Sequence, residues 1–379
     1  MLLFYHLLQF EMDLMQKSTS ELISALRLIL IMGLVLVHFG AFPGSKLDPF
    51  TGVYNADFIL PSSLNSFFVY FFLSAVPVLS IISGYLIALN GKPKYLLSLQ
   101  KRLTTVFLPS IFWTTIWLLF AFTLYSIGKN SGHFSYYDFG FSHFTIWTIL
   151  DGIFGIRSEP FAFQFWFVHD LILSVLFSPF IYLAIKRIPL IYFLVVGSLW
   201  IIGWEPPLFF YLKVTIFFSF GIYLAQKCWQ PPDRLPYGFL WVSLFVTLII
   251  IRIYLPNLFD GEMPYESVYE SILRTNGVIA VTFIAMSMRD KLPKSFQWFS
   301  THSGYSFFIF AAHFPTVILI KEILALLIGS DSMIQQLALW LLSPVLTISL
   351  LIIVANLMSR YANRLFKLVN GQRQISMNI

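Results

Sequence analysis

The stretch SALRLILIMGLVLVHFG, residues 24–40, decides the fold of this chain. Nearly all of it is apolar, and a helix that crosses a bilayer needs about 20 such residues. Two residues break the pattern, Arg27 and His38. An arginine in hydrocarbon costs at least about 2.5–3.5 kcal/mol on insertion scales, so it should face a partner or a cavity. The stretch therefore predicts a spanning helix with one polar face.

The composition of the whole chain agrees with a membrane protein. Of its 379 residues, 58% are hydrophobic and 11% are charged, whereas soluble domains carry roughly 25% charged residues. A soluble globule of this composition would expose large apolar patches and aggregate. We therefore predict an all-α polytopic membrane protein with the lipid bilayer as its solvent. The single cysteine, Cys228, excludes an intrachain disulfide framework.

Ten apolar segments are candidate spans, and the basic residues predict their orientation. Most Lys and Arg lie in one set of alternate connecting segments, which places both termini in the cytoplasm by the positive-inside rule. Because the net charge of +6 is explained in this way, no nucleic-acid partner is expected. The predicted spans are 22–42, 67–89, 104–127, 163–185, 189–204, 208–227, 237–256, 268–288, 303–328 and 333–357.

One membrane domain accounts for nearly the whole chain. We expect an N-terminal cytoplasmic segment (1–20), a transmembrane domain (21–369) and a C-terminal cytoplasmic tail (370–379). Segment 143–156 is apolar but contains Asp151 and two glycines, so it is expected to be a re-entrant or surface piece.

Arg27 and His38 are expected to point in the same direction. They are 11 positions apart, which at about 100° per residue is close to three full turns. Along the axis they lie roughly 16 Å apart, with Arg27 near the cytoplasmic face and His38 toward the outer face. The simpler alternative is an arginine that reaches the membrane edge and a histidine satisfied at the outer interface.

Further polar residues occur on neighbouring spans, and each has a structural interpretation beside a functional one. Small residues can pack helices, a basic pair at a cytoplasmic helix start can anchor topology, and a His or a His-Asp pair can be satisfied internally. The same residue types can bind phosphates or supply a base. The candidates are Ser83, Gly84, Lys101, Arg102, Trp166, His169, Asp170 and His313.

The spacing of these residues reduces the number of reaction classes that the sequence supports. No HxxxH or HExxH spacing occurs, so no metal site is expected. No GxSxG or Walker sequence occurs, so neither a serine hydrolase nor an ATPase is indicated. Basic groups at the cytoplasmic rim with histidines deeper in the membrane suit a phosphate-bearing donor and a base near an acceptor. Transport of a proton or an anion would suit the same series.

Five pieces of the sequence, taken in order, resemble the membrane acyltransferase-3 family, the O-acyltransferases that modify bacterial surface polysaccharides. The resemblance covers roughly residues 20–360 and favours the stand-alone branch, without an appended periplasmic hydrolase-like domain. The pieces are Arg27-x10-His38, SGY (83–85), KRLTTVFLP (101–109), FWFVHDL (165–171) and SFFIFAAHFPTV (306–317).

The resemblance implies transfer of an acyl group, usually acetyl, from cytoplasmic acyl-CoA to a sugar hydroxyl. His38 would be the catalytic base and Arg27 its essential partner, while Lys101 and Arg102 would bind the CoA phosphates. Thr105 stands where the family has its third basic residue. The resemblance also implies a location in the bacterial inner membrane and an association with polysaccharide biosynthesis machinery.

Residue type and depth suggest roles for the remaining candidates. Asp170 is the expected carboxylate that orients His38, and His313 is a second catalytic candidate. We assign Ser83 and Gly84 to the acyl-CoA side of the site. Trp166 and His169 are assigned to the acceptor side.

Two other classes of protein stay open at this level. A transporter or flippase for a lipid-linked sugar would use the polar series as its pathway, but such proteins often show internal repeats and none is visible here. A structural subunit of an envelope assembly would not need polar groups inside several spans. The glycan acceptor, the choice of acetyl, succinyl or a longer acyl group, and direct transfer against an acyl-enzyme also stay open.

Overall fold

A computed structural model describes residues 2–45, 47–53, 56–89, 95–128, 145–157, 159–204, 206, 211–232, 235–258 and 265–375. These residues form helices and connecting loops, with no strand among them. The helices are α1 (Leu2–Val37), α2 (Ile59–Phe72), α3 (Ala75–Ala88), α4 (Tyr95–Arg102), α5 (Leu108–Gly128), α6 (Ile146–Phe154), α7 (Trp166–Leu176), α8 (Ser178–Arg187), α9 (Pro189–Ile201), α10 (Leu212–Gln226), α11 (Gly238–Tyr254), α12 (Tyr265–Lys291), α13 (Pro293–Thr301), α14 (Ser306–Ile328), α15 (Met333–Tyr361) and α16 (Asn363–Val369).

The predicted polytopic helical fold is confirmed. Within the described residues, seven helical segments are long and apolar enough to cross a membrane, and three shorter apolar helices accompany them. The three shorter ones are α9, α10 and α11, which coincide with predicted spans. Helix α6 has nine residues, too few to cross a bilayer, and it begins inside the segment predicted as a re-entrant or surface piece.

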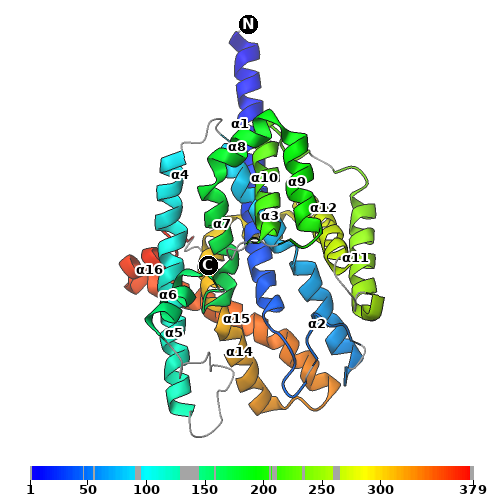
Figure 1. Ribbon diagram of the computed structural model, residues 1–379, viewed down its shortest axis with the longest axis vertical. Helices are drawn as coiled ribbons and strands as arrows, with labels where there is room; N and C mark the ends of the chain where they lie inside the picture. The colour runs from blue at the N-terminus through cyan, green and yellow to red at the C-terminus, as the bar shows by residue number, and fades with distance from the viewer. Residues whose placement is uncertain are drawn as a thin grey trace.

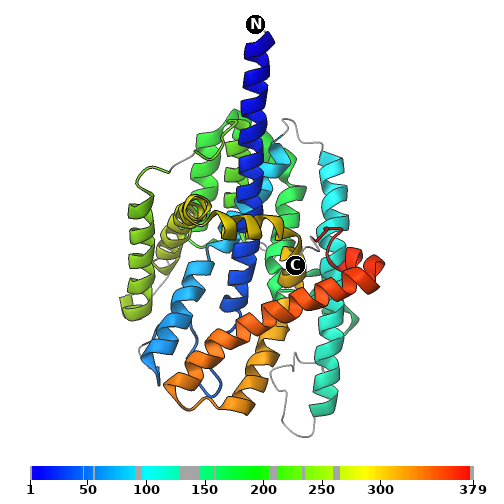
Figure 2. The same ribbon diagram turned by 180° about the vertical axis from the view of Figure 1, so that it is seen from behind.

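Helix α1 is the central element of the bundle. It runs along the long axis of the molecule (Figure 1) and packs against α2, α3, α13 and α14. The view from behind shows α15 crossing the lower part of the molecule obliquely before it meets α16 (Figure 2). Residues on α1 therefore have neighbours from distant parts of the chain.

Helices α3 and α10 approach at backbone distance because each contributes a glycine. A Cβ on Gly84 would lie 1.9 Å from the Phe218 carbonyl oxygen, and a Cβ on Gly221 would lie 2.1 Å from the Ile81 carbonyl oxygen. No side chain larger than hydrogen fits at either position. The assignment of Gly84 to the acyl-CoA site is therefore wrong, because this residue faces helix α10.

Helix α14 is interrupted directly after His313. Phe314 has a non-helical backbone (φ −109°, ψ 128°), and Pro315 follows it. Pro315 has no N–H to donate to the Ala311 carbonyl, four residues earlier. Two side chains replace that donor: Gln164 Nε2 at 3.3 Å and Trp117 Nε1 at 3.1 Å. Gln164 also donates to the Phe314 carbonyl at 3.1 Å, so side-chain hydrogen bonds stabilise the backbone conformation at the break.

Candidate active site

Two cavities follow one another along α1. The arginine cavity, of about 140 Å³, is lined by Arg27, Arg102 and Arg373 together with Ser83 and Ser306. The histidine cavity, of about 510 Å³, is lined by His38, Gln164 and Trp166 among other residues. Arg27 and His38 thus both face inward from α1, as the spacing predicts, but into separate spaces.

The arginine cavity concentrates positive charge without acidic side chains. None of the described residues that line it is an Asp or a Glu. Among the described residues, Arg27 and Arg102 make no hydrogen bond or ion pair, whereas Arg373 Nη1 donates to the carbonyls of Thr105 and Asn370 at 3.0 and 3.1 Å. Burial, and then the charges of Arg27 and Arg102, lower the pKa of Arg373 to about 9. Three guanidinium groups held together in this way are a site for a strongly anionic ligand.

Arg373 supplies a positive charge that sequence reasoning missed. Thr105 occupies the position where the acyltransferase pattern has its third basic residue, and Arg373 binds the carbonyl of that same Thr105. The approach depends on Gly371, which has φ +61° and whose Cβ would lie 2.0 Å from the Thr105 carbonyl oxygen. No local sequence signal marks this contact, because the two partners are 268 positions apart.

The other two residues assigned to the donor side have different positions. Ser83 lines the arginine cavity, and its buried hydroxyl has no hydrogen-bond partner among the described residues. Lys101 is exposed and does not line either cavity. Its carbonyl oxygen accepts hydrogen bonds from Thr104 and Thr105, so this residue belongs to the helix surface.

His38 and His313 are joined by a hydrogen bond whose donor and acceptor can be assigned. His38 Nδ1 lies 2.5 Å from His313 Nε2, and His313 Nδ1 lies 2.7 Å from the Phe310 carbonyl oxygen. A carbonyl only accepts, so His313 carries its proton on Nδ1 and accepts on Nε2. His38 must then donate from Nδ1, which leaves its Nε2 with a free lone pair. His38 lines the histidine cavity, whereas His313 is fully buried and lines neither space.

The turn that carries His38 is clamped by two side chains. Helix α1 ends at Val37, earlier than the predicted span end, and Gly40 follows with φ +69°. Lys321 Nζ donates to the carbonyls of Phe39 and Ala41 at 2.9 and 2.8 Å. Asn65 Nδ2 donates to the Gly40 carbonyl at 2.8 Å. Three carbonyls of the turn that follows α1 are thereby satisfied inside the protein.

Asp170 does not orient His38, which corrects the role predicted for it. Its Oδ1 lies 3.1 Å from His169 Nδ1, and its Oδ2 accepts from the Tyr211 backbone N–H at 3.0 Å. Both residues lie outside the lining of the histidine cavity. The pair therefore fixes the start of α10 against α7, while Trp166 alone of the acceptor-side candidates faces the cavity.

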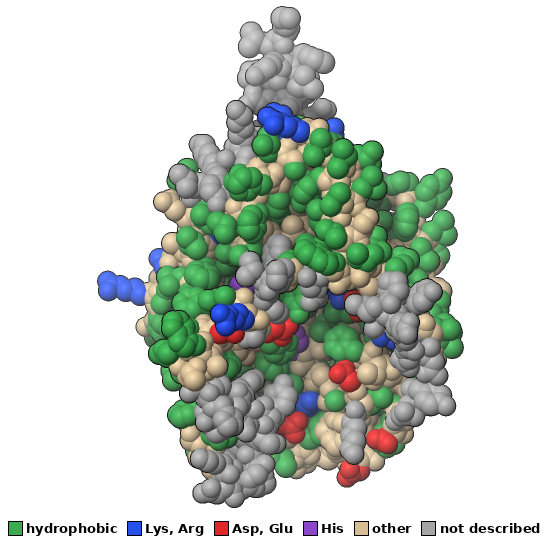
Figure 3. Space-filling model, viewed as in Figure 1, with side chains coloured by type: hydrophobic (Ala, Val, Ile, Leu, Met, Phe, Trp, Pro, Cys, Tyr) green, Lys and Arg blue, Asp and Glu red, His purple; other side chains and the backbone are tan. Residues whose placement is uncertain are grey.

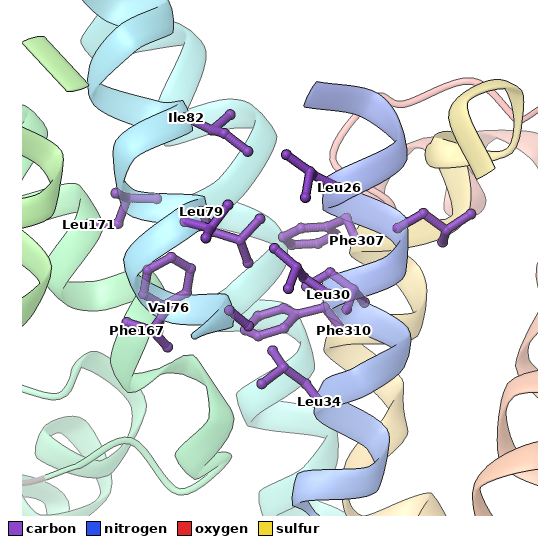
Figure 4. Close-up of a cluster of buried hydrophobic side chains, with 14 of the residues drawn as sticks. Leu26, Leu30, Leu34, Val76, Leu79, Ile82, Phe167, Leu171, Phe307 and Phe310 are labelled. Atoms are coloured by element: carbon purple, nitrogen blue, oxygen red, sulfur yellow. The ribbon is translucent and has the colours of Figure 1, made fainter. Parts of the chain in front are cut away.

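The face shown in Figure 3 is hollowed near its centre, where histidine and acidic side chains come to the surface. The two cavities are divided by an aromatic wall, which we define as Phe167 and Phe310, the two residues that line both. They lie in one apolar cluster with Leu30, Leu34 and Leu79 (Figure 4). Arg27 and His38 therefore face two chambers rather than one continuous cavity.

The fold and the two cavities define a class: a helical membrane protein with a three-arginine chamber and a histidine chamber along its first helix. The family described as acyltransferase domain matches residues 21–358, and the chain belongs to this membrane acyltransferase-3 family. The protein is thus a multi-pass membrane acyltransferase, as the five sequence pieces predict.

One relative extends the comparison over almost the whole chain. The chain is 26% identical to the succinoglycan biosynthesis protein ExoH of Rhizobium meliloti (strain 1021) over 377 residues, which cover 95% of this chain and 94% of the relative. No solved structure matches the chain.

Proposed function

We propose that this enzyme transfers an acyl group from cytoplasmic acyl-CoA to a hydroxyl of an exported polysaccharide, with His38 as the base. The observation that carries the proposal is the pairing of a three-arginine chamber with a histidine chamber across the aromatic wall. The polysaccharide acceptor is supported by similarity to a protein named for succinoglycan biosynthesis.

The arginine cavity fits the phosphates of acyl-CoA. The nucleotide end of CoA carries a diphosphate and a further phosphate, and planar guanidinium groups bind such oxygens in bidentate fashion. Arg27, Arg102 and Arg373 meet this demand, and the unpartnered Ser83 hydroxyl adds a neutral donor. The long pantetheine arm can then carry the thioester past the wall toward His38.

The histidine pair suits removal of a proton from a sugar hydroxyl. His38 Nε2 takes the proton as the hydroxyl oxygen attacks the thioester carbonyl carbon. A C–O bond forms, the C–S bond breaks, and the CoA thiolate leaves with the proton that His38 returns. Such a base is worth about 10²–10⁴-fold in rate. His313 touches no reacting atom and is a positioning residue that keeps Nε2 of His38 unprotonated.

The aromatic wall explains how the two substrates stay apart until they react. Phe167 and Phe310 must rotate or shift for the thioester to reach His38, and in the observed arrangement they separate the chambers. Exclusion of water from the thioester limits hydrolysis, which would waste the donor.

A transfer assay with the purified enzyme tests the proposal. The donors are labelled acetyl-CoA and succinyl-CoA, and the acceptor is unacylated exopolysaccharide from a strain that lacks the gene. We expect label in the glycan with wild type, and its loss in His38→Ala and Arg27→Ala. His302→Ala is the control, because this histidine lies outside both cavities. Undiminished transfer by His38→Ala would refute the catalytic assignment, and comparison of the two donors would name the acyl group.

A further inference from the structure

A third cavity, of about 250 Å³, has no part in the mechanism above. We call it the tryptophan cavity, after Trp200 and Trp204 at the end of α9; Tyr211 and Lys213 at the start of α10 and Glu270 and Ser271 on α12 also line it. Its volume falls below the range of about 300–1,000 Å³ that is typical of pockets for drug-sized ligands. The cavity therefore suits one small ring rather than a long chain.

Aromatic rings form one side of the tryptophan cavity. Trp200 packs its ring edge-to-face against Phe217 at a centroid distance of 5.2 Å, which holds the indole in place. Trp204 keeps 46% of its surface exposed although it is a large aromatic residue. Aromatic rings bury much apolar surface in a fixed orientation. The C–H face of a pyranose ring is a flat apolar surface of matching size.

Polar groups form the other side. Ser271 is 5% exposed and lines the cavity, and within the part of the chain that the structure describes its hydroxyl has no hydrogen-bond partner. A buried polar group without a partner is costly, and a ligand hydroxyl would satisfy it. Beside it, Glu270 accepts from Arg274 Nη2 at 3.0 Å, which leaves carboxylate lone pairs for further donors. Hydroxyl groups of a sugar both donate and accept, as this mixture requires.

The tryptophan cavity adjoins the histidine cavity through one side chain. Trp166 lines the histidine cavity, and its ring lies edge-to-face with Tyr211 of the tryptophan cavity at 5.3 Å. Lys213 Nζ lies 4.7 Å from the Trp166 ring centroid and 4.2 Å from that of Tyr211, so it bridges the two walls. A ligand with linked rings could occupy both spaces.

We propose that the tryptophan cavity binds a pyranose unit of the acceptor glycan, adjacent to the unit whose hydroxyl is acylated beside His38. This inference rests on the proposed function and deepens it, since it makes the acceptor an oligosaccharide or polymer rather than a lone sugar.

The test compares acceptors of different length. Unacylated exopolysaccharide from a gene-deletion strain is cut to monosaccharides and longer oligosaccharides, and transfer from acyl-CoA is measured with each. In Trp204→Ala and Ser271→Ala we expect the KM for oligosaccharides to rise about tenfold and threefold, with kcat and the KM for monosaccharides unchanged. Unchanged oligosaccharide KM in both variants overturns the inference.

Two matched controls and one binding measurement complete the design. Trp241→Ala removes an indole of similar exposure (39%) elsewhere, and Ser178→Ala removes another buried, unpartnered hydroxyl; neither lines the tryptophan cavity. Calorimetric titration with the oligosaccharides needs no acyl-CoA. Binding that is lost in Trp204→Ala, without transfer by wild type, would support the subsite and refute the transfer reaction. Absence of oligosaccharide binding by wild type would overturn the subsite.

Discussion

Replacement of Lys321 by methionine is expected to disturb the position of His38 while it changes the free energy of unfolding only slightly. Lys321 lies on α14, two turns beyond His313, and is almost fully buried. Its ammonium donates to the Phe39 and Ala41 carbonyls, on the turn that begins with His38. Methionine has a similar length and no charge, so it fills the space without making either hydrogen bond.

Two large energies oppose each other at this residue. Two hydrogen bonds from a charged donor are worth roughly 1.5–3 kcal/mol each, but burial of the ammonium costs several kcal/mol. The free energy of unfolding should therefore change by no more than about 2 kcal/mol. The turn, however, loses two of its restraints, and a displacement of about 1 Å at a reacting group can cost about 10²-fold in rate. We expect kcat to fall between about tenfold and a hundredfold.

The assay measures kcat, both KM values and the melting temperature of purified Lys321→Met. We expect a low kcat with near-normal KM for acyl-CoA and a small change in melting temperature. Glu322→Gln is the control, because that carboxylate is 4.0 Å from Lys321 Nζ and its side chain is 56% exposed, so its loss should change neither quantity. A wild-type kcat in Lys321→Met, or an equal loss in Glu322→Gln, would refute the reasoning.

Two further predictions concern the arginine cavity and the aromatic wall. Arg373→Gln should raise the KM for acyl-CoA about tenfold, the equivalent of one 1.4 kcal/mol contact, without an equal loss of kcat. Arg364→Gln is the control, because this exposed arginine lines neither cavity; an equal rise in the KM for acyl-CoA in both variants, or no rise in Arg373→Gln, would contradict the assignment. Phe310→Ala should open the wall between the chambers, so that thiol release from acyl-CoA without acceptor increases relative to glycan acylation; an unchanged ratio would show that the wall does not exclude water.

The spans, and the common inward direction of the Arg27 and His38 side chains on α1, could be predicted because both depend on local periodicity. Runs of apolar residues set the helices, and the spacing from Arg27 to His38 sets their common direction. Gly84 shows the limit of this reasoning, since a glycine that admits a ligand and one that admits a helix look alike in sequence. Only the contact with the Phe218 carbonyl distinguishes them.

Arg373 and Lys321 could not be found from the sequence for a different reason. Each acts on a carbonyl that lies more than 260 positions away, Thr105 for Arg373 and Phe39 for Lys321. Near the ends of spans, basic residues are expected for topology alone, so their presence carries no further information. Their roles arise where the C-terminal segment and α14 meet the first helices of the chain.

The partner of His38 is a histidine rather than the expected carboxylate, and the membrane gives a reason. An ionised Asp in place of His313 would bring a full charge to a fully buried position, at a cost of several kcal/mol. A neutral His313 accepts the Nδ1 proton of His38 on its Nε2, as a carboxylate oxygen would. Its own Nδ1 donates to the Phe310 carbonyl, which fixes the ring. It stabilises the imidazolium less than a carboxylate would. A thioester is already an activated acyl donor, however, so a weaker base suffices where a peptide bond would need a stronger one. The pair therefore adds no permanent charge directly beside His38, and the three guanidinium groups lie in the separate arginine cavity.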